Sequence, residues 1–431
     1  MKIALVHDWL TGMRGGEKCL EVACRRFPGA RLFTLIHRPS STSPAIERMA
    51  ITTSWLNRLP CAHRYYRYLL PLMPGAVERL RLPDDVDLVL SFSHAVAKSI
   101  QPPSGVPHVC YCFTPMRYAW HRRGDYFPQS ATGQTGGPSW PPAALGDRLS
   151  AGLRDRLLDR LRDWDRRTAH RVTHFVAISR NIQQRISECY GRDSRLIYPP
   201  VDTDYFTPDP GTPRDDFYLH VGALVPYKRT DLAVAACNRL GRRLIVVGDG
   251  PELPRLRRLA GPNVTLLGRQ SDEVVHELLR RCRALLFAAN EDFGIVPLEA
   301  QACGAPVIAL AQGGALETVR PCGESTPGSG WLFAEQSVES LAAAVTRSEA
   351  HARLFDPDLA RRQAERFRAE RFERELVGLV EEVAAERQPA AGRRGVEESR
   401  GRGIAAGEQK DTCTNGANRL KCPQRAISSV G

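Results

Sequence analysis

Short runs of hydrophobic residues alternate with amphipathic stretches along most of the chain. The runs that read as buried strands are Ile3–Val6, Leu88–Leu90, Val109–Tyr111 and His174–Ile178 in the first half, then Tyr218–Val221, Leu244–Val247, Val264–Leu267, Leu285–Ala288, Val307–Leu310 and Trp331–Phe333 in the second. Helical patterns such as Thr230–Leu240, Asp272–Arg281 and Pro297–Ala302 separate them. Continuous apolar strands separated by helices are typical of parallel sheets covered on both faces. The pattern predicts an α/β fold with two doubly wound, Rossmann-like domains.

A stretch rich in proline and aspartate, Tyr198–Asp216, separates the two sets of strands. It predicts an N-terminal domain over residues 1–198 and a C-terminal domain over residues 199–358. Ligands of open parallel sheets bind beyond the carboxyl ends of the strands, so we expect the two domains to face a cleft that holds the ligand. After the last strand, Leu359–Ala385 reads as one long helix. We expect this helix to pack back onto the first domain.

Two stretches have a composition that does not favour regular structure. Residues 386–431 are rich in Gly, Arg and Ser and contain few large apolar residues, which predicts a disordered tail. Gln129–Pro142 is rich in Gly, Ser, Thr and Pro, and this composition predicts a mobile insertion in the first domain.

The overall composition is that of an ordinary globular protein, with 42% hydrophobic and 25% charged residues. No run of about 18 apolar residues occurs, so no transmembrane helix is expected. The start, Met1–Leu10, reads as a first buried strand rather than a signal peptide. The 12 cysteines are scattered along a chain without a secretion signal. This pattern favours reduced thiols and a cytoplasmic location.

The chain carries a formal net charge of +12, which favours anionic partners. No nucleic-acid-binding motif occurs, so a nucleic-acid partner is not expected. His63–Pro74 interleaves aromatic, basic and apolar residues, and Arg148–Arg171 is an arginine-dense helical pattern with an apolar stripe. The stripe fits either core packing or contact with a membrane. The more specific hypothesis is that the protein attaches peripherally to an anionic surface, namely the inner face of the plasma membrane.

The stretch "EDFGIVPLE" carries the main candidate site. Glu291 lies just past the end of a predicted strand, and Glu299 lies about one turn into the helix that follows. Unpaired backbone N–H groups at the start of this helix would attract a phosphate or a polyhydroxyl ligand. Gly294 would let the ligand approach the backbone closely. The paired carboxylates in this setting predict recognition of a hydroxyl-bearing ligand.

Other turns after predicted strands are rich in glycine or basic residues. Gly15 and Gly16 open a helix, without the spacing of a dinucleotide fingerprint or of a P-loop. Lys228 and Arg229 follow the first strand of the second set, where a cation can neutralise a diphosphate leaving group. The loop from Gly248 to Glu252 is a similar strand end that could hold a nucleoside.

Two further features are less informative. Gly313–Gly314 follows another predicted strand and fits either a ligand loop or a plain turn. The Asp-x-Asp strings Asp163–Asp165 and Asp202–Asp204 lie in a charged helical pattern and in the proline-rich join. Neither string follows a strand end, so no essential metal and no other essential cofactor is expected.

Seven of these stretches together resemble the retaining glycosyltransferases of family 4, which have the two-domain GT-B fold. The matching stretches are "VHDWLTGMRGGEK", "CYCFTPMRYAW", "FVAISRN", "IYPPVDTDYF", "VGALVPYKR", "VVGDGPE" and "EDFGIVPLEAQACGAPVIA", and they extend over roughly residues 1–335. The residues in these stretches look most like those of the bacterial mannosyltransferase branch of O-antigen and exopolysaccharide synthesis. The resemblance implies an acceptor-side N-terminal domain and a C-terminal domain that binds a nucleotide sugar.

The resemblance also implies roles for single residues. Glu291 would bind the donor hexose, Glu299 would bind the ribose, and Lys228 would offset the diphosphate charge. The remaining donor-binding positions would be Gly15, Gly16, Gly222, Gly248, Phe293, Gly294 and Ile295. The reaction implied is transfer of a hexose, with retention, to a lipid-linked or polysaccharide acceptor. GDP-mannose is the expected donor, and a UDP-sugar is the alternative.

Two positions depart from the family pattern. Ala223 stands where the family often has an arginine, so Arg229 is the candidate substitute. Phe113 stands where many members have a histidine near the reacting sugar, and a phenyl ring cannot donate a hydrogen bond. Either His94 or Arg117 covers that role on the acceptor side, or the chain is a catalytically impaired nucleotide-sugar-binding protein.

Overall fold

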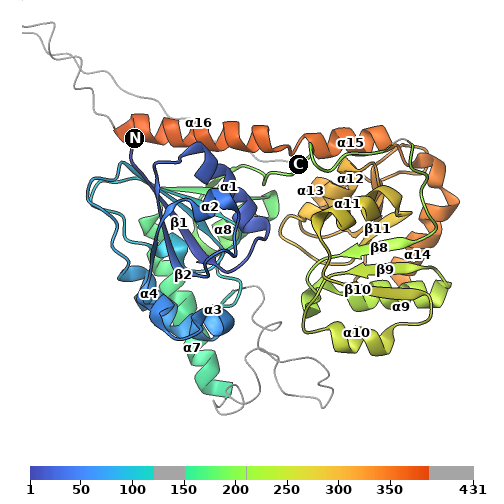
Figure 1. Cartoon of the computed structure of the whole chain (residues 1–431), viewed down its shortest axis with the longest axis horizontal. Helices are drawn as coiled ribbons and strands as arrows, with labels where there is room; N and C mark the ends of the chain where they lie inside the picture. The colour runs from blue at the N-terminus through green and yellow to red at the C-terminus, as the bar shows by residue number, and fades with distance from the viewer. Residues whose placement is uncertain (121–150, 210, 388–431) are drawn as a thin grey trace, which may run out of the picture. The chain divides into compact units, whose positions relative to one another are not determined.

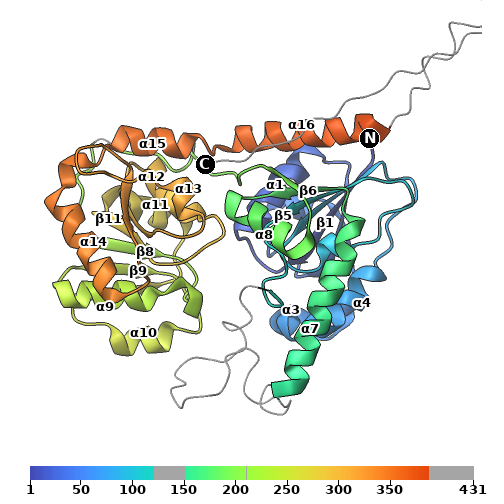
Figure 2. The same ribbon diagram turned by 180° about the vertical axis from the view of Figure 1, so that it is seen from behind.

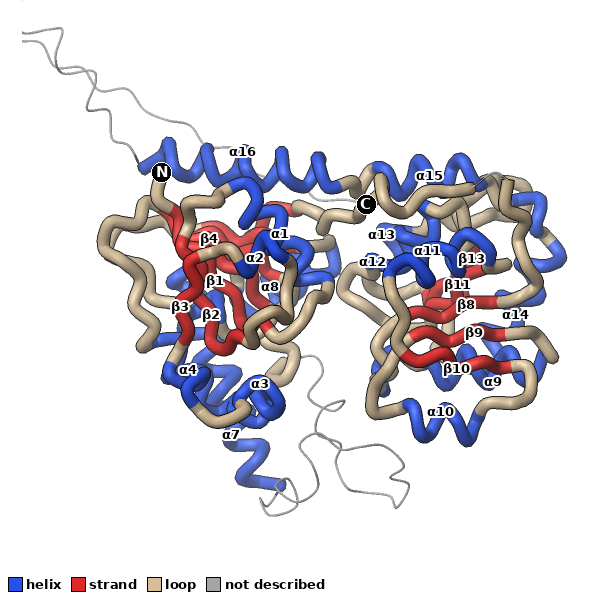
Figure 3. The backbone as a smooth tube through the Cα atoms, in the orientation of Figure 1, coloured by secondary structure: helices blue, strands red, loops and turns tan. Residues whose placement is uncertain are grey.

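The computed structural model describes residues 1–120, 151–209 and 211–387, which form one compact unit. The predicted insertion at Gln129–Pro142 and almost all of the predicted tail lie outside the described residues. The strands of the described chain form two all-parallel sheets, drawn in red in Figure 3. This arrangement confirms the predicted α/β class with two Rossmann-like sheets.

The first sheet has seven strands. They are β1 (Ile3–Leu10), β2 (Arg31–His37), β3 (Ala50–Thr53), β4 (Leu88–Ser93), β5 (His108–Cys112), β6 (His174–Ala177) and β7 (Ser194–Leu196), in the order β3-β2-β1-β4-β5-β6-β7. The α-helices between them are α1 (Gly15–Arg26), α2 (Pro44–Glu47), α3 (Ala62–Tyr65), α4 (Met73–Glu78), α7 (Ala151–Arg167) and α8 (Arg180–Tyr190). Short 3₁₀ turns are η1 (Trp55–Arg58), η2 (Tyr66–Leu72), η3 (Ala97–Ser99) and η4 (Thr168–Arg171).

The second sheet has six strands. They are β8 (Tyr218–Val221), β9 (Leu244–Val247), β10 (Val264–Gly268), β11 (Ala284–Phe287), β12 (Val307–Leu310) and β13 (Gly330–Phe333), in the order β10-β9-β8-β11-β12-β13. The α-helices are α9 (Thr230–Leu240), α10 (Leu253–Leu259), α11 (Asp272–Arg281), α12 (Ile295–Ala302), α13 (Ala315–Thr318) and α14 (Val338–Ala350), with 3₁₀ turns η5 (Pro226–Lys228) and η6 (Ala352–Leu354). The switch in strand order between β8 and β11 places their carboxyl ends next to each other.

The expectation of one helix over Leu359–Ala385 is wrong. The chain forms two helices, α15 (Pro357–Glu365) and α16 (Ala369–Arg387), with a break in between. At the break, the N–H of Val201 donates to the carbonyl oxygen of Phe367 at 2.9 Å, and this bridge takes the backbone out of helical geometry. This bond connects the segment between the two strand sets to the turn between α15 and α16.

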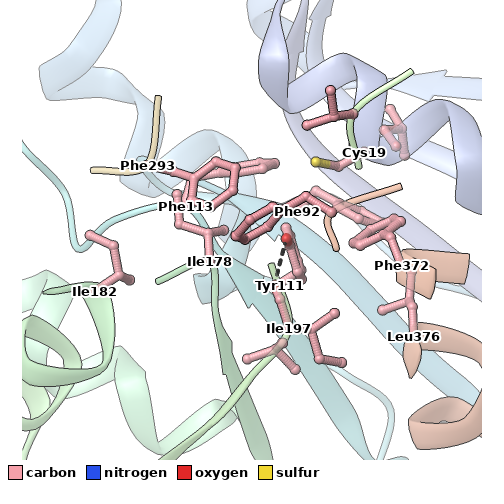
Figure 4. Close-up of a cluster of buried hydrophobic side chains, with 14 of the residues drawn as sticks. Cys19, Phe92, Tyr111, Phe113, Ile178, Ile182, Ile197, Phe293, Phe372 and Leu376 are labelled. Atoms are coloured by element: carbon pink, nitrogen blue, oxygen red, sulfur yellow. Dashed lines mark hydrogen bonds between the residues drawn. The ribbon is translucent and has the colours of Figure 1, made fainter. Parts of the chain in front are cut away.

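Helix α16 returns to the first sheet, where it lies beside α1 (Figure 1). Arg26 of α1 lies 3.9 Å from Glu373 of α16. The ring of Phe372 packs at 5.4 Å from the ring of Tyr111 on β5, edge to face. Tyr111 also donates its hydroxyl hydrogen to the carbonyl oxygen of Ile197 (Figure 4). The core of the first sheet therefore contains side chains from both ends of the described chain.

A buried ion pair links η3 to α7. Lys98 and Asp165 are almost fully buried, with Nζ 3.1 Å from Oδ1, and Oδ2 of Asp165 accepts bonds from Trp120 and Tyr190. Helix α7 lies beside α4 (Figure 2). The indole of Trp164 on α7 donates a hydrogen bond to Glu78 of α4 at 3.0 Å. Asp165 thus stabilises the packing of α7. The sequence analysis did not predict this structural role for the Asp163–Asp165 string.

In the described part of the chain, no helix is long and apolar enough to cross a membrane. The cysteines that lie within apolar segments of the sequence are buried and free: Cys19, Cys24, Cys237, Cys282 and Cys303.

Candidate functional site

Glu291 and Lys228 form an ion pair at the carboxyl edge of the second sheet. Glu291 lies in the loop between β11 and α12, and Lys228 ends the 3₁₀ turn that follows the neighbouring strand β8. The Nζ atom of Lys228 contacts Oε1 of Glu291 directly, and both side chains keep part of their surface exposed. The structure thus brings together two of the predicted catalytic residues, with opposite charges that hold each other in place.

The second glycine-rich turn holds the loop of Glu291 from the side. The N–H of Gly314 donates to the carbonyl oxygen of Glu291 at 2.8 Å. A Cβ atom at Gly313 would overlap with that same carbonyl oxygen, and one at Gly314 would overlap with the backbone of Phe293. Gly313–Gly314 therefore lets two strand ends approach closely, which explains why both positions need glycine.

Gly222 and Gly248 lie against each other at the ends of β8 and β9. A Cβ atom at Gly248, where φ is +146°, would overlap with the carbonyl oxygen of Gly222. The N–H of Gly222 donates to the carbonyl oxygen of Val247 at 3.0 Å. Lys228 also lies close, because its Nζ is 4.0 Å from where a Cβ of Gly222 would be. These two predicted donor-binding glycines thus lie next to the lysine of the ion pair.

Glu299, in α12, is buried and pairs with Lys18 of α1. The Nζ of Lys18 lies 3.1 Å from Oε1 of Glu299, and this carboxylate raises the pKa of the lysine. Close to this pair, a Cβ at Gly15 would lie 2.9 Å from the Cδ1 atom of Ile295, the first residue of α12. The predicted glycine turn of the first sheet therefore contacts the helix that carries the predicted ribose-binding glutamate.

Asp292 makes contacts that sequence reasoning missed. The hydroxyl of Ser179 donates to its main-chain carbonyl oxygen at 2.6 Å. Its carboxylate pairs with Arg185 of α8 and lies 3.6 Å from Nη2 of Arg117. The next residue, Phe293, is buried and stacks on Tyr198 with ring centroids 5.7 Å apart. These contacts fix the backbone on the C-terminal side of Glu291.

Two of the three predicted acceptor-side residues, His94 and Phe113, lie in a cluster of rings with His7. His94 and Phe113 have ring centroids 6.3 Å apart, and His7 lies 6.4 Å from each of them. A Cβ atom at Gly16 would lie 3.3 Å from the Phe113 ring. Within the described residues, neither ring nitrogen of the buried His7 has a hydrogen-bond partner, although Nε2 lies 3.8 Å from Glu17.

Arg229 takes a different place from Lys228. Its backbone is left-handed, with φ at +51°, and its guanidinium contacts Asp231 and Gln336. These contacts hold Arg229 at the start of α9. The Asp-x-Asp string at Asp202–Asp204 also has a local use, because Asp202 accepts the N–H of Tyr205 at 3.0 Å.

Part of the chain matches a known protein family. Residues 207–366 match the family described as "Glycosyl transferases group 1". This span contains Glu291, Glu299 and Lys228.

Curated relatives match in part. The D-inositol 3-phosphate glycosyltransferase of Geodermatophilus obscurus is 36% identical over 254 residues, which is 52% of this chain and 55% of the relative. The GDP-mannose-dependent alpha-(1-6)-phosphatidylinositol monomannoside mannosyltransferase of Mycolicibacterium smegmatis is 32% identical over 184 residues, which is 36% of this chain and 48% of the relative. The chain thus spans about half the length of these two relatives.

Solved structures match over most of the chain. HepE from Anabaena, crystallised with UDP, superposes with a TM-score of 0.60 at 17% identity and covers 89% of this chain and 100% of its own. Sucrose-phosphate synthase from Thermosynechococcus elongatus superposes with a TM-score of 0.62 at 18% identity and covers 90% of this chain and 100% of its own. At these identities the likeness concerns the fold, which is the GT-B fold of glycosyltransferases.

Proposed function

We propose that this chain transfers a hexose from a nucleotide sugar to a lipid-linked or saccharide acceptor. The observation that carries the proposal is the pairing of Lys228 with Glu291 at the carboxyl edge of the second sheet. A nucleotide sugar carries a diphosphate, whose negative charge a lysine attracts. It also carries hexose hydroxyls, which can donate hydrogen bonds to a carboxylate. The group 1 match over residues 207–366 supports the same reaction class.

In the reaction that we assign to the site, the residues around the donor act mainly by stabilising charge on the leaving diphosphate, and less by transferring protons. As the bond between the anomeric carbon and the diphosphate breaks, negative charge grows on the departing oxygen. Lys228 then stabilises the diphosphate, and Glu291 is left to hold the hexose hydroxyls. Glu299, which pairs with Lys18, accepts hydrogen bonds from the ribose hydroxyls. On this assignment the configuration at the anomeric carbon is retained.

GDP-mannose is the donor that we propose. The mycobacterial relative that is named for GDP-mannose is 32% identical over 184 residues, which supports this choice. The structure of HepE contains UDP, so a UDP-sugar is the second candidate. The acceptor is a saccharide or a lipid-linked saccharide precursor of a polysaccharide such as O-antigen.

The proposal competes with a non-catalytic protein that only binds nucleotide sugars, because Phe113 replaces the expected histidine. The test is incubation of the purified chain with GDP-mannose and with UDP-sugars in the presence of lipid-linked acceptors. Saturable release of the nucleoside diphosphate, coupled to sugar transfer, supports the enzyme. Tight nucleotide binding without turnover on any acceptor would establish the non-catalytic protein instead.

We also propose that the protein attaches peripherally to an anionic membrane. Leu72 in η2 is 46% exposed and Leu153 in α7 is 50% exposed, whereas Leu161 of α7 is buried. The apolar stripe of α7 is therefore core at one end and exposed at the other. The exposed arginines Arg64 and Arg67 precede Leu72 in the sequence, and their charge suits an acidic surface.

A further inference from the structure

Arg229 directly follows the lysine of the Lys228–Glu291 pair, and its backbone is unusual for a residue that carries a side chain. Its φ is +51° and its ψ is +40°, which is the left-handed region, between the end of η5 and the start of α9. A residue other than glycine keeps such a conformation only where its surroundings hold it there, and such residues cluster at functional sites. The contacts of the arginine side chain show what holds this backbone.

The guanidinium of Arg229 is bonded on two sides. Its Nε and Nη2 atoms donate to the two carboxylate oxygens of Asp231 at 3.1 and 3.4 Å. Its Nη1 atom donates to Oε1 of Gln336 at 3.3 Å. Gln336 lies between β13 and α14, and its Nε2 atom donates to the carbonyl oxygen of Ala288 at 2.8 Å. Gln336 thus connects the residue after Lys228 to the residue just past the end of β11.

The two contacts of Gln336 need an amide side chain. The guanidinium of Arg229 only donates hydrogen bonds and the carbonyl group of Ala288 only accepts them. A side chain between these groups must therefore accept at one end and donate at the other, as an amide does. In Gln336→Glu the contact with Arg229 would remain, whereas the contact with Ala288 would be lost.

A second bridge connects the start of α9 to β11. Thr230 is buried, and its hydroxyl lies 2.9 Å from Nε2 of His220 on β8. Nδ1 of His220 lies 3.2 Å from the carbonyl oxygen of Leu286 on β11. Because a carbonyl group only accepts, Nδ1 donates to it, and Nε2 of the neutral ring accepts from the hydroxyl. Both residues that follow Lys228 are thus linked to the strand that leads to Glu291.

The ion pair between Lys228 and Glu291 closes a ring of contacts. Arg229 follows Lys228 directly, Gln336 bridges Arg229 to Ala288, and Ala288 precedes Glu291 by three residues. The ammonium of Lys228 contacts the carboxylate of Glu291. The guanidinium of Arg229 is meanwhile bonded to Asp231 and Gln336, so these contacts fix the turn on which Lys228 lies.

We propose that Arg229 and Gln336 are positioning residues, which hold Lys228 in the place from which its charge acts on the leaving diphosphate. This inference rests on the proposed transferase function. Lys228 supplies the charge, and the other two residues set the place of its ammonium relative to Glu291. A displacement of about 1 Å in a catalytic group can cost about 10²-fold in rate, so a turn that carries such a group has to be fixed.

The first measurement needs no ligand. Crystal structures of the wild-type chain, Gln336→Met and Gln336→Glu are compared. In both variants we expect the ammonium of Lys228 to lie more than about 4 Å from the carboxylate of Glu291, beyond the range of an ion pair. Gln184→Met, at an exposed glutamine of α8, should leave the pair in place. An unmoved ion pair in the Gln336 variants would overturn the proposal.

The second measurement separates positioning from direct contact with the phosphates. Calorimetry gives the affinity for GDP and UDP in Arg229→Lys and Arg229→Gly, each alone and combined with Lys228→Met. Arg229→Lys keeps a positive charge but loses the planar fork, so we expect both single variants to lose about tenfold. Combined with Lys228→Met, either should cost less than about twofold more, because the residue through which it acts has been removed. Full affinity in Arg229→Lys, or a further tenfold loss in a combined variant, would assign Arg229 to the phosphates directly and overturn the proposal.

Turnover gives a third readout. In Gln336→Met we expect the rate of sugar transfer at saturating donor to fall by about 10- to 100-fold, whereas Gln184→Met should keep the wild-type rate. A wild-type rate in Gln336→Met would contradict the positioning role. If the wild-type chain binds neither nucleotide, the proposed function fails, and the ligand-free structures still decide whether Gln336 holds Lys228 in place.

Discussion

Lys18 of α1 and Glu299 of α12 form an ion pair of 3.1 Å between residues that are 281 positions apart in the sequence. The lysine side chain is 38% exposed and the glutamate side chain 8%. The carboxylate is therefore the more deeply buried partner, and it depends on the lysine for compensation of its charge.

Loss of Lys18 should destabilise the fold more than loss of a surface cation. In Lys18→Met we expect the free energy of unfolding to fall by roughly 1–2 kcal/mol, less than for a fully buried pair because the lysine is partly solvated. The matched control is Arg25→Met, which removes the i,i+4 pair with Glu21 on the surface of the same helix. Urea unfolding measures both, and equal effects would show that the Lys18 pair has no special weight.

Removal of the Glu291 charge should abolish most turnover. In Glu291→Gln the side chain keeps its size but loses the ion pair with Lys228 and the strongest acceptor for hexose hydroxyls. We expect the rate of transfer to fall by about 10²- to 10³-fold, the usual effect of one electrostatic contact in an active site. Steady-state assays with the exposed Glu339→Gln as control measure the effect. A variant that keeps wild-type turnover would refute the role given to Glu291.

Two glycine substitutions should change stability in opposite directions. Gly248→Ala places a Cβ on the carbonyl oxygen of Gly222, so we expect a loss of roughly 2–4 kcal/mol and of nucleotide binding. Gly378→Ala, in the interior of α16 with nothing within 4 Å, should stabilise the protein by roughly 0.5–1 kcal/mol. Thermal unfolding with and without GDP distinguishes them. If Gly248→Ala were as stable as the wild type, the two strand ends could not be in contact.

Acidification should weaken the fold through buried histidines. Burial lowers the pKa values of His94, His108 and His220 to about 4 from an ordinary value of 6.5. Between these values the unfolded chain binds protons that the folded chain excludes, so stability rises with pH across this window and is lost as the pH falls through it. Each histidine should contribute on the order of 2 kcal/mol between pH 7 and pH 4.5.

Unfolding experiments at several pH values check this prediction. In His220→Asn the ring that contacts Leu286 and Thr230 is removed, so we expect lower stability at pH 7 but a shallower loss on acidification. The exposed His351→Asn should keep the wild-type slope. An unaltered slope in His220→Asn would mean that this histidine does not contribute to acid sensitivity.

Membrane attachment should depend on salt and on the exposed leucines. We expect the chain to sediment with vesicles that contain an anionic phospholipid at low ionic strength, and to be released at high ionic strength. Leu72→Ser with Leu153→Ser should weaken sedimentation, whereas Leu316→Ser, at another exposed leucine, should not. Absence of binding to anionic vesicles at low salt would remove the membrane proposal.

The sequence predicted most clearly those elements whose apolar residues are continuous and bounded by turns. The run Tyr218–Val221 and the helix Thr230–Leu240 have the bounds that the sequence indicated. Three strands of the first sheet were missed. Strand β2 is largely buried, but Thr34 divides its apolar residues into two short runs. Strand β3 was missed because its side chains alternate between exposed and partly buried, and β7 because it has only 3 residues.

The candidate site was predictable only within single loops. Glu291, Gly294 and Glu299 are close in sequence, so a strand-to-helix turn brings them together. The pairs Lys18–Glu299 and Arg185–Asp292 join distant segments, and their side chains meet only once both sheets have formed. A clearer local signal was Asp8, because a carboxylate in a wholly buried strand needs hydrogen-bond donors, and the backbone N–H groups of residues 94–97 supply them. The domain limits at residues 198 and 358, and the roles of the site residues, stay predictions.

The return of α16 to the first sheet has a consequence for folding during synthesis. A ribosome releases β1 to β7 long before it releases Phe372, which packs on Tyr111 in the core of the first sheet. N-terminal domains of larger proteins commonly fold first, as soon as they emerge. Here the nascent first sheet would expose the apolar surface around Tyr111 until the ribosome has added more than 170 residues beyond Leu196 (from 196 to 372). Chaperone contact with the nascent chain should therefore last until α16 has emerged.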